Sequence, residues 1–118
     1  MHLILRVVAL AATICGAQSA SAVQTFTNTT ITELTIDRAY SNFVAITVAG
    51  TPTGTTSCAT GYANWSFTLS LNDAIGTNMY ALLLTAFAEG KPVTLYGTGS
   101  CSEQAGVESL SLAQIPAS

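Results

Sequence analysis

The sequence predicts a mainly β fold with one helix, in the order strand, strand, strand, helix, strand, strand. One observation is the stretch Asp73 to Pro92, whose apolar residues recur at the spacing of a single helical stripe. A second is that the segments on either side of it alternate like strands and show no helical period. We therefore expect the helix to pack its apolar stripe against a sheet.

The predicted helix has a clear C-terminal end. Gly90 stands where a left-handed cap is favoured, and Pro92 follows it. The helix should thus end by Glu89, and a strand should begin at Val93. The stripe that faces the sheet consists of Met79, Leu82, Leu83, Ala86 and Phe87.

Two β-type segments open the domain. The segment from Phe26 to Tyr40 shifts its inward set between Ile31 and the pair Leu34 and Ile36, which predicts a bulge or bend. The second segment runs from Phe43 to Gly50. Its inward face consists of Val44, Ile46 and Val48.

The third strand alternates most regularly. Apolar Trp65, Phe67, Leu69 and Leu71 are separated by Ser and Thr, so Trp65 is expected in the core. Between strands two and three, Gly50 to Asn64 forms a turn-rich loop. Loops of this length in small domains are usually functional or pinned.

Two shorter strands follow the helix. They run from Val93 to Tyr96 and from Val107 to Ile115, the latter with Leu110 and Leu112 on one face. Five strands with one helix between the third and fourth is the element order of an OB-like barrel. A flat α+β sandwich of the same elements is the structural alternative.

Residues 1–22 are predicted to be a signal peptide. Arg6, an apolar run and the small-x-small site Ala20-Ser21-Ala22 support this prediction. A retained membrane anchor and a lipid-modified Cys15 are the alternatives. Cleavage leaves one domain, residues 23–118, without a membrane span, in a secreted or periplasmic protein.

Cys58 and Cys101 are the cysteines that remain after cleavage. In an oxidising compartment they are expected to form a disulfide. Two reduced thiols with a redox or metal role are the alternative.

The charges are few and acidic, with a net charge of −3 for the chain. Binding to nucleic acid needs clustered Lys and Arg. Because only Arg38 and Lys91 remain after cleavage, we expect no nucleic-acid partner.

The sequence does not favour an enzyme. The chain's one histidine, His2, lies in the leader, which removes His-dependent nucleophiles and common zinc sites. The pairs Asp37 with Asp73 and Glu103 with Glu108 could serve glycoside chemistry, but we interpret them as scattered exposed carboxylates. No cofactor and no metal is expected.

The candidate binding residues are aromatic or apolar. Tyr40, Tyr62 and Tyr96 fall in or beside loops or on outward strand positions, where a ring with a hydroxyl suits sugar stacking and protein interfaces. On the helix, Tyr80 and Leu84 lie outside the main stripe. This second apolar face suggests oligomerisation, although a helix wedged in a small barrel would give the same pattern.

One block of the sequence resembles a known family. W-x-F-x-L from Trp65, followed by MYALLLTAFAEGKPVTLYGTGSC, is similar to part of the B subunits of the subtilase cytotoxin type. The likeness covers about Asn64 to Cys101 and consists mostly of core and turn positions. It implies an exported OB-fold protein that forms ring pentamers, binds sialylated glycans and carries a catalytic A subunit. No glycan-contacting residue can be matched to this chain.

These observations lead to one functional expectation. The chain is predicted to be an exported, non-enzymatic binding module, like a toxin B subunit, that recognises a glycan or a protein and can form a homo-oligomer. The alternative is a monomeric structural or interaction protein of the cell envelope that binds no sugar.

Overall fold

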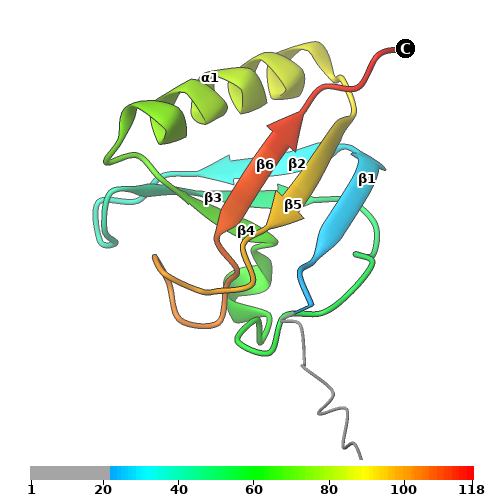
Figure 1. The fold of residues 1–118 in the computed structure, drawn as a ribbon. Helices are drawn as coiled ribbons and strands as arrows, with labels where there is room; N and C mark the ends of the chain where they lie inside the picture. Colours follow the sequence, from blue (N-terminus) through cyan, green and yellow to red (C-terminus); the bar gives the residue numbers. More distant parts are fainter. Residues whose placement is uncertain (1–21) are drawn as a thin grey trace, which may run out of the picture.

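The computed structural model describes residues 22–118, so the predicted leader lies outside the described residues except for Ala22. The fold is mainly β with one helix, as the sequence predicts (Figure 1). It contains two three-stranded antiparallel sheets, ordered β1-β5-β6 and β2-β3-β4. In residues 22–118 no helix has the length and apolar character to cross a membrane.

The predicted first strand is divided between the two sheets. Its first half is β1 (Thr25–Thr29), which pairs with β5 (Val93–Gly97), and its second half is β2 (Ile31–Thr35), which pairs with β3 (Phe43–Val48). The register of β2 against β3 also shifts between Ile31 and Glu33, which confirms the bulge or bend predicted after Ile31. The strand count is six rather than five, because the break at Thr30 separates β1 from β2.

The remaining strands complete the two sheets. β4 (Phe67–Ser70) pairs with β3, and β6 (Leu110–Gln114) pairs with β5. The sheets remain open rather than forming a continuous barrel. One isolated parallel bridge, Thr68 to Ser109, connects β4 with the residue before β6.

Helix α1 (Ala74–Glu89) begins and ends at capping residues. Asp73 Oδ1 accepts a hydrogen bond from Gly76 N at 2.6 Å, which satisfies a backbone donor of the first turn. Gly90 adopts φ 65° at the other end, so the predicted glycine cap is confirmed.

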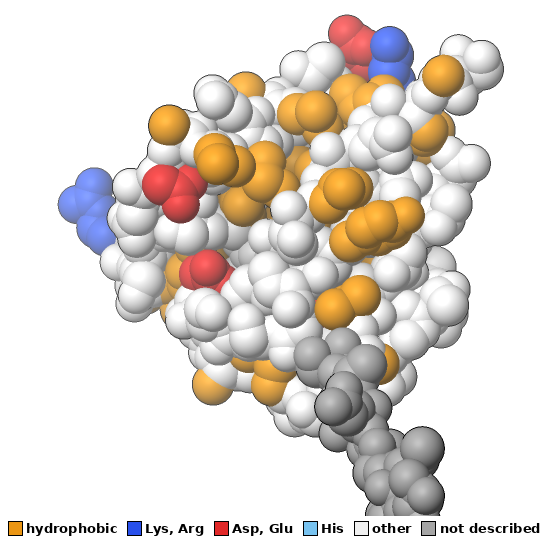
Figure 2. All heavy atoms as spheres, viewed as in Figure 1, with side chains coloured by type: hydrophobic (Ala, Val, Ile, Leu, Met, Phe, Trp, Pro, Cys, Tyr) orange, Lys and Arg blue, Asp and Glu red, His pale blue; other side chains and the backbone are white. Residues whose placement is uncertain are grey.

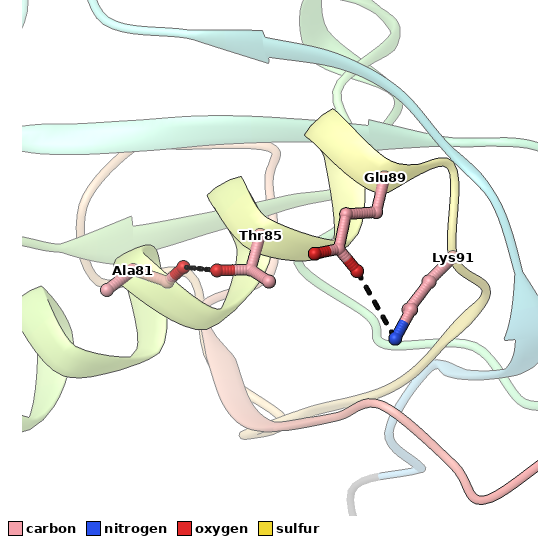
Figure 3. A network of polar contacts seen from close by, with 4 residues as sticks. All are labelled: Ala81, Thr85, Glu89 and Lys91. Atoms are coloured by element: carbon pink, nitrogen blue, oxygen red, sulfur yellow. Dashed lines mark hydrogen bonds and ion pairs between the residues drawn. The ribbon is translucent and has the colours of Figure 1, made fainter.

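The last turns of α1 carry exposed polar contacts. Thr85 Oγ1 donates to the Ala81 carbonyl at 3.0 Å, and Lys91 Nζ lies 3.2 Å from Glu89 Oε2 (Figure 3). Both partners of the ion pair are more than half exposed, so it contributes little to stability.

The apolar stripe of α1 is narrower than its sequence predicts. Leu83 and Ala86 are fully buried and belong to the core, but Phe87 is 45% exposed. Successive helical residues are separated by about 100° around the axis. Phe87 therefore falls at the edge of the stripe and remains partly uncovered.

The hydrophobic core lies between the sheets and beneath α1. The inward residues predicted for β3, Val44, Ile46 and Val48, are buried, and Phe26 meets Phe67 edge to face with ring centroids 5.7 Å apart. In contrast, Ile36 follows the end of β2 and is exposed. The inward assignment of Ile36 is therefore wrong.

The last strand contains a bulge that its sequence does not predict. Leu112 pairs with Tyr96 while Leu110 pairs with the next residue, Gly97, so the register shifts between the two pairs. A one-residue shift sends side chains to the opposite face. Leu110 is therefore buried and Leu112 is exposed, which corrects the prediction that both share one face.

Candidate functional site

Four aromatic side chains from two loops and one strand meet near the surface. This aromatic cluster consists of Tyr40, Phe43, Tyr62 and Trp65. The Trp65 ring lies edge-on to Tyr40 and Tyr62, with centroids 5.3 and 5.6 Å away, and 6.1 Å from Phe43. Phe43 is buried beneath the cluster, while Tyr62 is 40% exposed.

Tyr40 is positioned by the tight connection between β2 and β3. Asp37 Oδ1 accepts a hydrogen bond from Ala39 N at 2.8 Å, and the Asp37 carbonyl accepts one from Tyr40 N at 3.1 Å. This aspartate-centred turn is a common local device for reversing a chain. Its effect here is to direct the half-buried Tyr40 ring toward Trp65.

Tyr62 is positioned by a turn with unusual backbone angles. Gly61, Ala63 and Asn64 all have positive φ, at 85°, 53° and 59°. For alanine this conformation is uncommon and costs about 1–2 kcal/mol. The Tyr62 carbonyl accepts a hydrogen bond from Trp65 N at 3.1 Å, which closes the turn and holds the two rings together.

The loop that carries Tyr62 is pinned along its length. Thr53 and Thr25 exchange two backbone hydrogen bonds of 2.8 and 2.9 Å, and Thr60 N donates to the Gly106 carbonyl at 3.0 Å. Between them, the Cys58–Cys101 disulfide is present as predicted. The long loop is therefore held in place on both sides of its cysteine.

The two cluster tyrosines are directly connected through their hydroxyls, which lie 2.8 Å apart. This hydrogen bond raises the pKa of Tyr40 above its ordinary value. Partial desolvation and the negative charge of nearby Asp37 act in the same direction. Tyr40 therefore stays protonated at neutral pH, and its hydroxyl is available for hydrogen bonding.

Trp65 does not lie where its strand pattern predicts. The strand begins only at Phe67, which is fully buried, whereas Trp65 is half-buried and belongs to the end of the loop. The core assignment of Trp65 is wrong. The apolar alternation in the sequence begins at Trp65, two residues before the strand begins at Phe67.

The structure brings together Tyr40 and Tyr62 among the predicted site residues. Tyr96 lies on β5, 41% exposed, and pairs with Leu112 and Thr25 on the outer face of its sheet. Tyr80 packs partly buried against the core, and Leu84 is exposed on α1.

The carboxylates Glu103 and Glu108 are not scattered on the surface. Glu103 Oε2 accepts hydrogen bonds from the hydroxyls of Thr68, at 3.0 Å, and Ser109. Glu108 is completely buried and accepts hydrogen bonds from three separate segments. The interpretation of this pair as exposed is wrong, because Glu108 is buried and Glu103 is partly buried against residues on other segments.

The aromatic cluster is a surface platform rather than a deep pocket. Surface hollows occur elsewhere, for example one of about 240 Å³ between α1 and β6 lined by Asp73 and Glu103. Within residues 22–118, no group of three or more His, Cys, Asp or Glu side chains is arranged to hold a metal ion. A platform of this kind can stack and hydrogen-bond a ligand.

No protein-family model matches the chain, and no curated protein or solved structure is detectably similar to it. The platform must therefore be interpreted from its own chemistry. It presents aromatic ring faces and edges, two phenolic hydroxyls and the nearby carboxylate of Asp37. A stacking surface beside hydrogen-bonding groups suits a ligand that has an apolar face and carries hydroxyl groups.

Proposed function

We propose that this chain is an exported, non-enzymatic binding module that holds a glycan at the aromatic cluster. The observation that carries the proposal is the exposed Tyr62 ring, joined to Tyr40 through their hydroxyls and packed edge-on against Trp65. The Cys58–Cys101 disulfide is consistent with a secreted or periplasmic location.

The arrangement matches what a sugar requires. A pyranose has an apolar face of C–H groups and a rim of hydroxyls, so it binds best to an aromatic ring flanked by hydrogen-bonding groups. Tyr62 supplies an accessible ring, and the two hydroxyls of the tyrosine pair can donate and accept. Asp37 adds a carboxylate acceptor close to Tyr40.

The platform is also largely preformed. The disulfide and the Thr60 to Gly106 hydrogen bond restrain the loop of Tyr62, while the Asp37 turn restrains Tyr40. A ligand would therefore lose little free energy in ordering these loops, which favours binding by a small exposed site.

We further propose that the two sheets form an OB-like barrel. The shared strand β1–β2 and the parallel Thr68–Ser109 bridge support this arrangement, since both join one sheet to the other. In OB-folds ligands bind beside the loop between the first two barrel strands. Tyr40 lies in the corresponding connection, between β2 and β3.

A glycan array with matched variants tests the proposal. Labelled protein is applied to immobilised oligosaccharides as wild type, Tyr62→Ala and Tyr96→Ala. The two tyrosines are equally exposed, at 40% and 41%, but only Tyr62 belongs to the aromatic cluster. We expect glycan binding that Tyr62→Ala abolishes and Tyr96→Ala retains. Binding that depends on neither residue would contradict the assigned site.

A second candidate is an interaction protein of the cell envelope that binds no sugar. It is favoured by Ile75, Leu84 and Phe87, which are exposed on α1. Figure 2 shows hydrophobic side chains across this view of the molecule and few charged ones. Exposed apolar side chains on the helix could also support a homo-oligomer, a pentamer if the resemblance to toxin B subunits extends to assembly.

The solution mass of the exported protein separates the two candidates. Light scattering that gives a ring-sized oligomer would support the multivalent glycan-binding proposal. A monomer that also fails to bind the array would favour the envelope protein.

A further inference from the structure

The most deeply buried acidic side chain of the described chain is Glu108, which is 0% exposed. Its Oε1 atom accepts hydrogen bonds from Gln24 N and Gln24 Nε2, each at 3.1 Å, and from the Thr56 hydroxyl. Its Oε2 atom accepts one from Gly99 N at 2.9 Å. The carboxylate thus joins the start of the domain, the long loop and the connection that follows β5.

Glu108 has hydrogen-bond donors but no positive partner in residues 22–118. The salt bridge found within these residues joins Lys91 to Glu89 on the surface and does not involve Glu108. Burying a carboxylate that lacks a counter-charge is costly even when hydrogen bonds satisfy its oxygens. A cation close to Glu108 would therefore stabilise the fold.

The Thr56 hydroxyl is shared between two acceptors. Thr56 Oγ1 lies 3.0 Å from the carbonyl oxygen of Ala22 and is also within hydrogen-bond distance of Glu108 Oε1. A threonine hydroxyl has one proton to donate. While Ala22 is present, its carbonyl competes with Glu108 for that proton.

Ala22 is the last residue of the predicted leader and is exposed. We propose that hydrolysis of the Ala22–Val23 bond creates an α-ammonium group on Val23 that pairs with the buried carboxylate of Glu108. A peptide hydrolase of the signal-peptidase class adds one water molecule and breaks the C–N bond. Ala22 then carries a carboxylate, and Val23 carries an amine that is protonated at neutral pH.

The new charge arises within reach of Glu108. Gln24 N is 3.1 Å from Glu108 Oε1, and an extended chain advances by at most about 3.6 Å per residue. The nitrogen of Val23 therefore lies within roughly 7 Å of the carboxylate. Rotation at the freed end of the chain can shorten this distance, because the bond to Ala22 no longer restrains it.

Processing has two effects in this account. It removes the Ala22 carbonyl that competes for the Thr56 hydroxyl, and it supplies the counter-charge that Glu108 lacks. The mature domain is therefore more stable than the same domain with residues ahead of Val23. The inference does not depend on which ligand the aromatic cluster binds.

The first test uses protein exported from the full gene. N-terminal sequencing should begin at Val23, and any other start would overturn the proposal. A variant with one alanine inserted between Ala22 and Val23, shown by N-terminal sequencing to begin with that alanine, has a mature chain longer by one residue and its ammonium displaced. We expect its Tm to be lower by about 4 °C or more. An equal Tm would overturn the pairing.

Two substitutions show whether the effect passes through Glu108. In a Glu108→Gln background the inserted alanine should no longer change the Tm, because the counter-charge has no carboxylate to meet. In the matched control Glu103→Gln the insertion should lower the Tm as it does in wild type. An undiminished effect of the insertion in Glu108→Gln would contradict the proposal.

A chemical measurement keeps the proposal testable if Glu108→Gln does not fold. The rate at which an acylating reagent modifies the α-amine of Val23 is measured by mass spectrometry in native and urea-unfolded protein. The paired amine should react several-fold more slowly in the native state, while exposed Lys91 serves as the internal reference. Equal native and unfolded rates, relative to Lys91, would show that the amine is free.

Discussion

The hydroxyl of Tyr40 lies 2.8 Å from the hydroxyl of Tyr62, joining two loops that are separate in sequence. Each ring also meets Trp65 edge-on, so the contact is part of a larger cluster. Because the hydrogen bond raises the pKa of Tyr40, the cluster should be sensitive to alkaline pH.

The first prediction concerns this alkaline sensitivity. Because the pKa of Tyr40 is raised in the folded state, the fold favours the neutral phenol. The contribution of Tyr40 to the free energy of unfolding is therefore complete below its unfolded-state pKa of about 10. It should be lost as pH rises through the folded pKa. We expect the free energy of unfolding to fall above pH 10 less steeply in Tyr40→Phe than in wild type, as measured by urea denaturation.

The ultraviolet absorbance of tyrosinate provides the control. Tyr62→Phe removes the hydroxyl partner and should shift the titration of Tyr40 toward lower pH. Tyr96→Phe, a change outside the aromatic cluster, should leave the titration of Tyr40 in place. An unchanged Tyr40 titration in Tyr62→Phe would mean that the hydroxyl contact does not cause the shift.

The second prediction concerns the disulfide. Cys58 and Cys101 are 43 residues apart, and closing a loop of that size in the unfolded chain is worth about 4 kcal/mol. The variant with both cysteines changed to serine should lose stability of this order in urea denaturation. Two titratable thiols in freshly exported wild-type protein, or an unchanged urea midpoint in the variant, would contradict this prediction.

The third prediction concerns the backbone of the Tyr62 turn. Ala63 has φ 53°, a conformation in which glycine carries no steric cost. Ala63→Gly removes this steric cost but also gives the unfolded chain more conformational entropy. The net effect should be a free energy of unfolding that is higher by roughly 0.5–1 kcal/mol.

The opposite substitution two residues earlier, at Gly61, is its control. Gly61 has φ 85° and open space where a Cβ would lie, so only backbone strain opposes a side chain there. Gly61→Ala should destabilise by about 1 kcal/mol or more. If both substitutions shift stability in the same direction, the assigned turn conformation is wrong.

The fourth prediction concerns the packing of Gly97 against Glu108. A Cβ at Gly97 would lie 1.8 Å from Glu108 Oε2, so Gly97→Ala must displace the buried carboxylate and its hydrogen bonds. We expect a loss of about 3 kcal/mol or more. Truncating the carboxylate with Glu108→Ala should make the same glycine substitution much less harmful. Strictly additive effects in the double variant would argue against this contact.

The helix and the disulfide could be predicted because their signals are local or compositional. Gly90 and Pro92 end α1 through their own backbone preferences, and two cysteines in a domain that is predicted to be exported allow one pairing. The bend of the first strand was also visible in its shifting face. Each of these predictions needs little knowledge of tertiary contacts.

The features that were missed depend on distant contacts. The burial of Glu108 is set by Gln24, Thr56 and Gly99, none of which is its neighbour in sequence. The bulge that exposes Leu112 is defined only by its pairing with β5. One feature of the sequence does point to the buried glutamate. Gly97 lies in a strand, where glycine is unusual and often marks a site that another group approaches closely.

The aromatic cluster was predicted in part. Tyr40 and Tyr62 were candidates because they fall in loops, but their mutual hydrogen bond could not be predicted without the fold. Trp65 was assigned to the core because alternation with Phe67 does not reveal where a strand begins. Its half-exposed position makes the chain's one tryptophan a reporter within the candidate site.

Trp65 fluorescence therefore offers the most direct test of the glycan proposal. Wild type, Tyr62→Ala and Tyr96→Ala are titrated with the oligosaccharide that gives the strongest array signal. We expect a saturable change in wild type and Tyr96→Ala that is absent in Tyr62→Ala. An array with no glycan bound, or a fluorescence response that survives in Tyr62→Ala, would contradict glycan binding at the aromatic cluster.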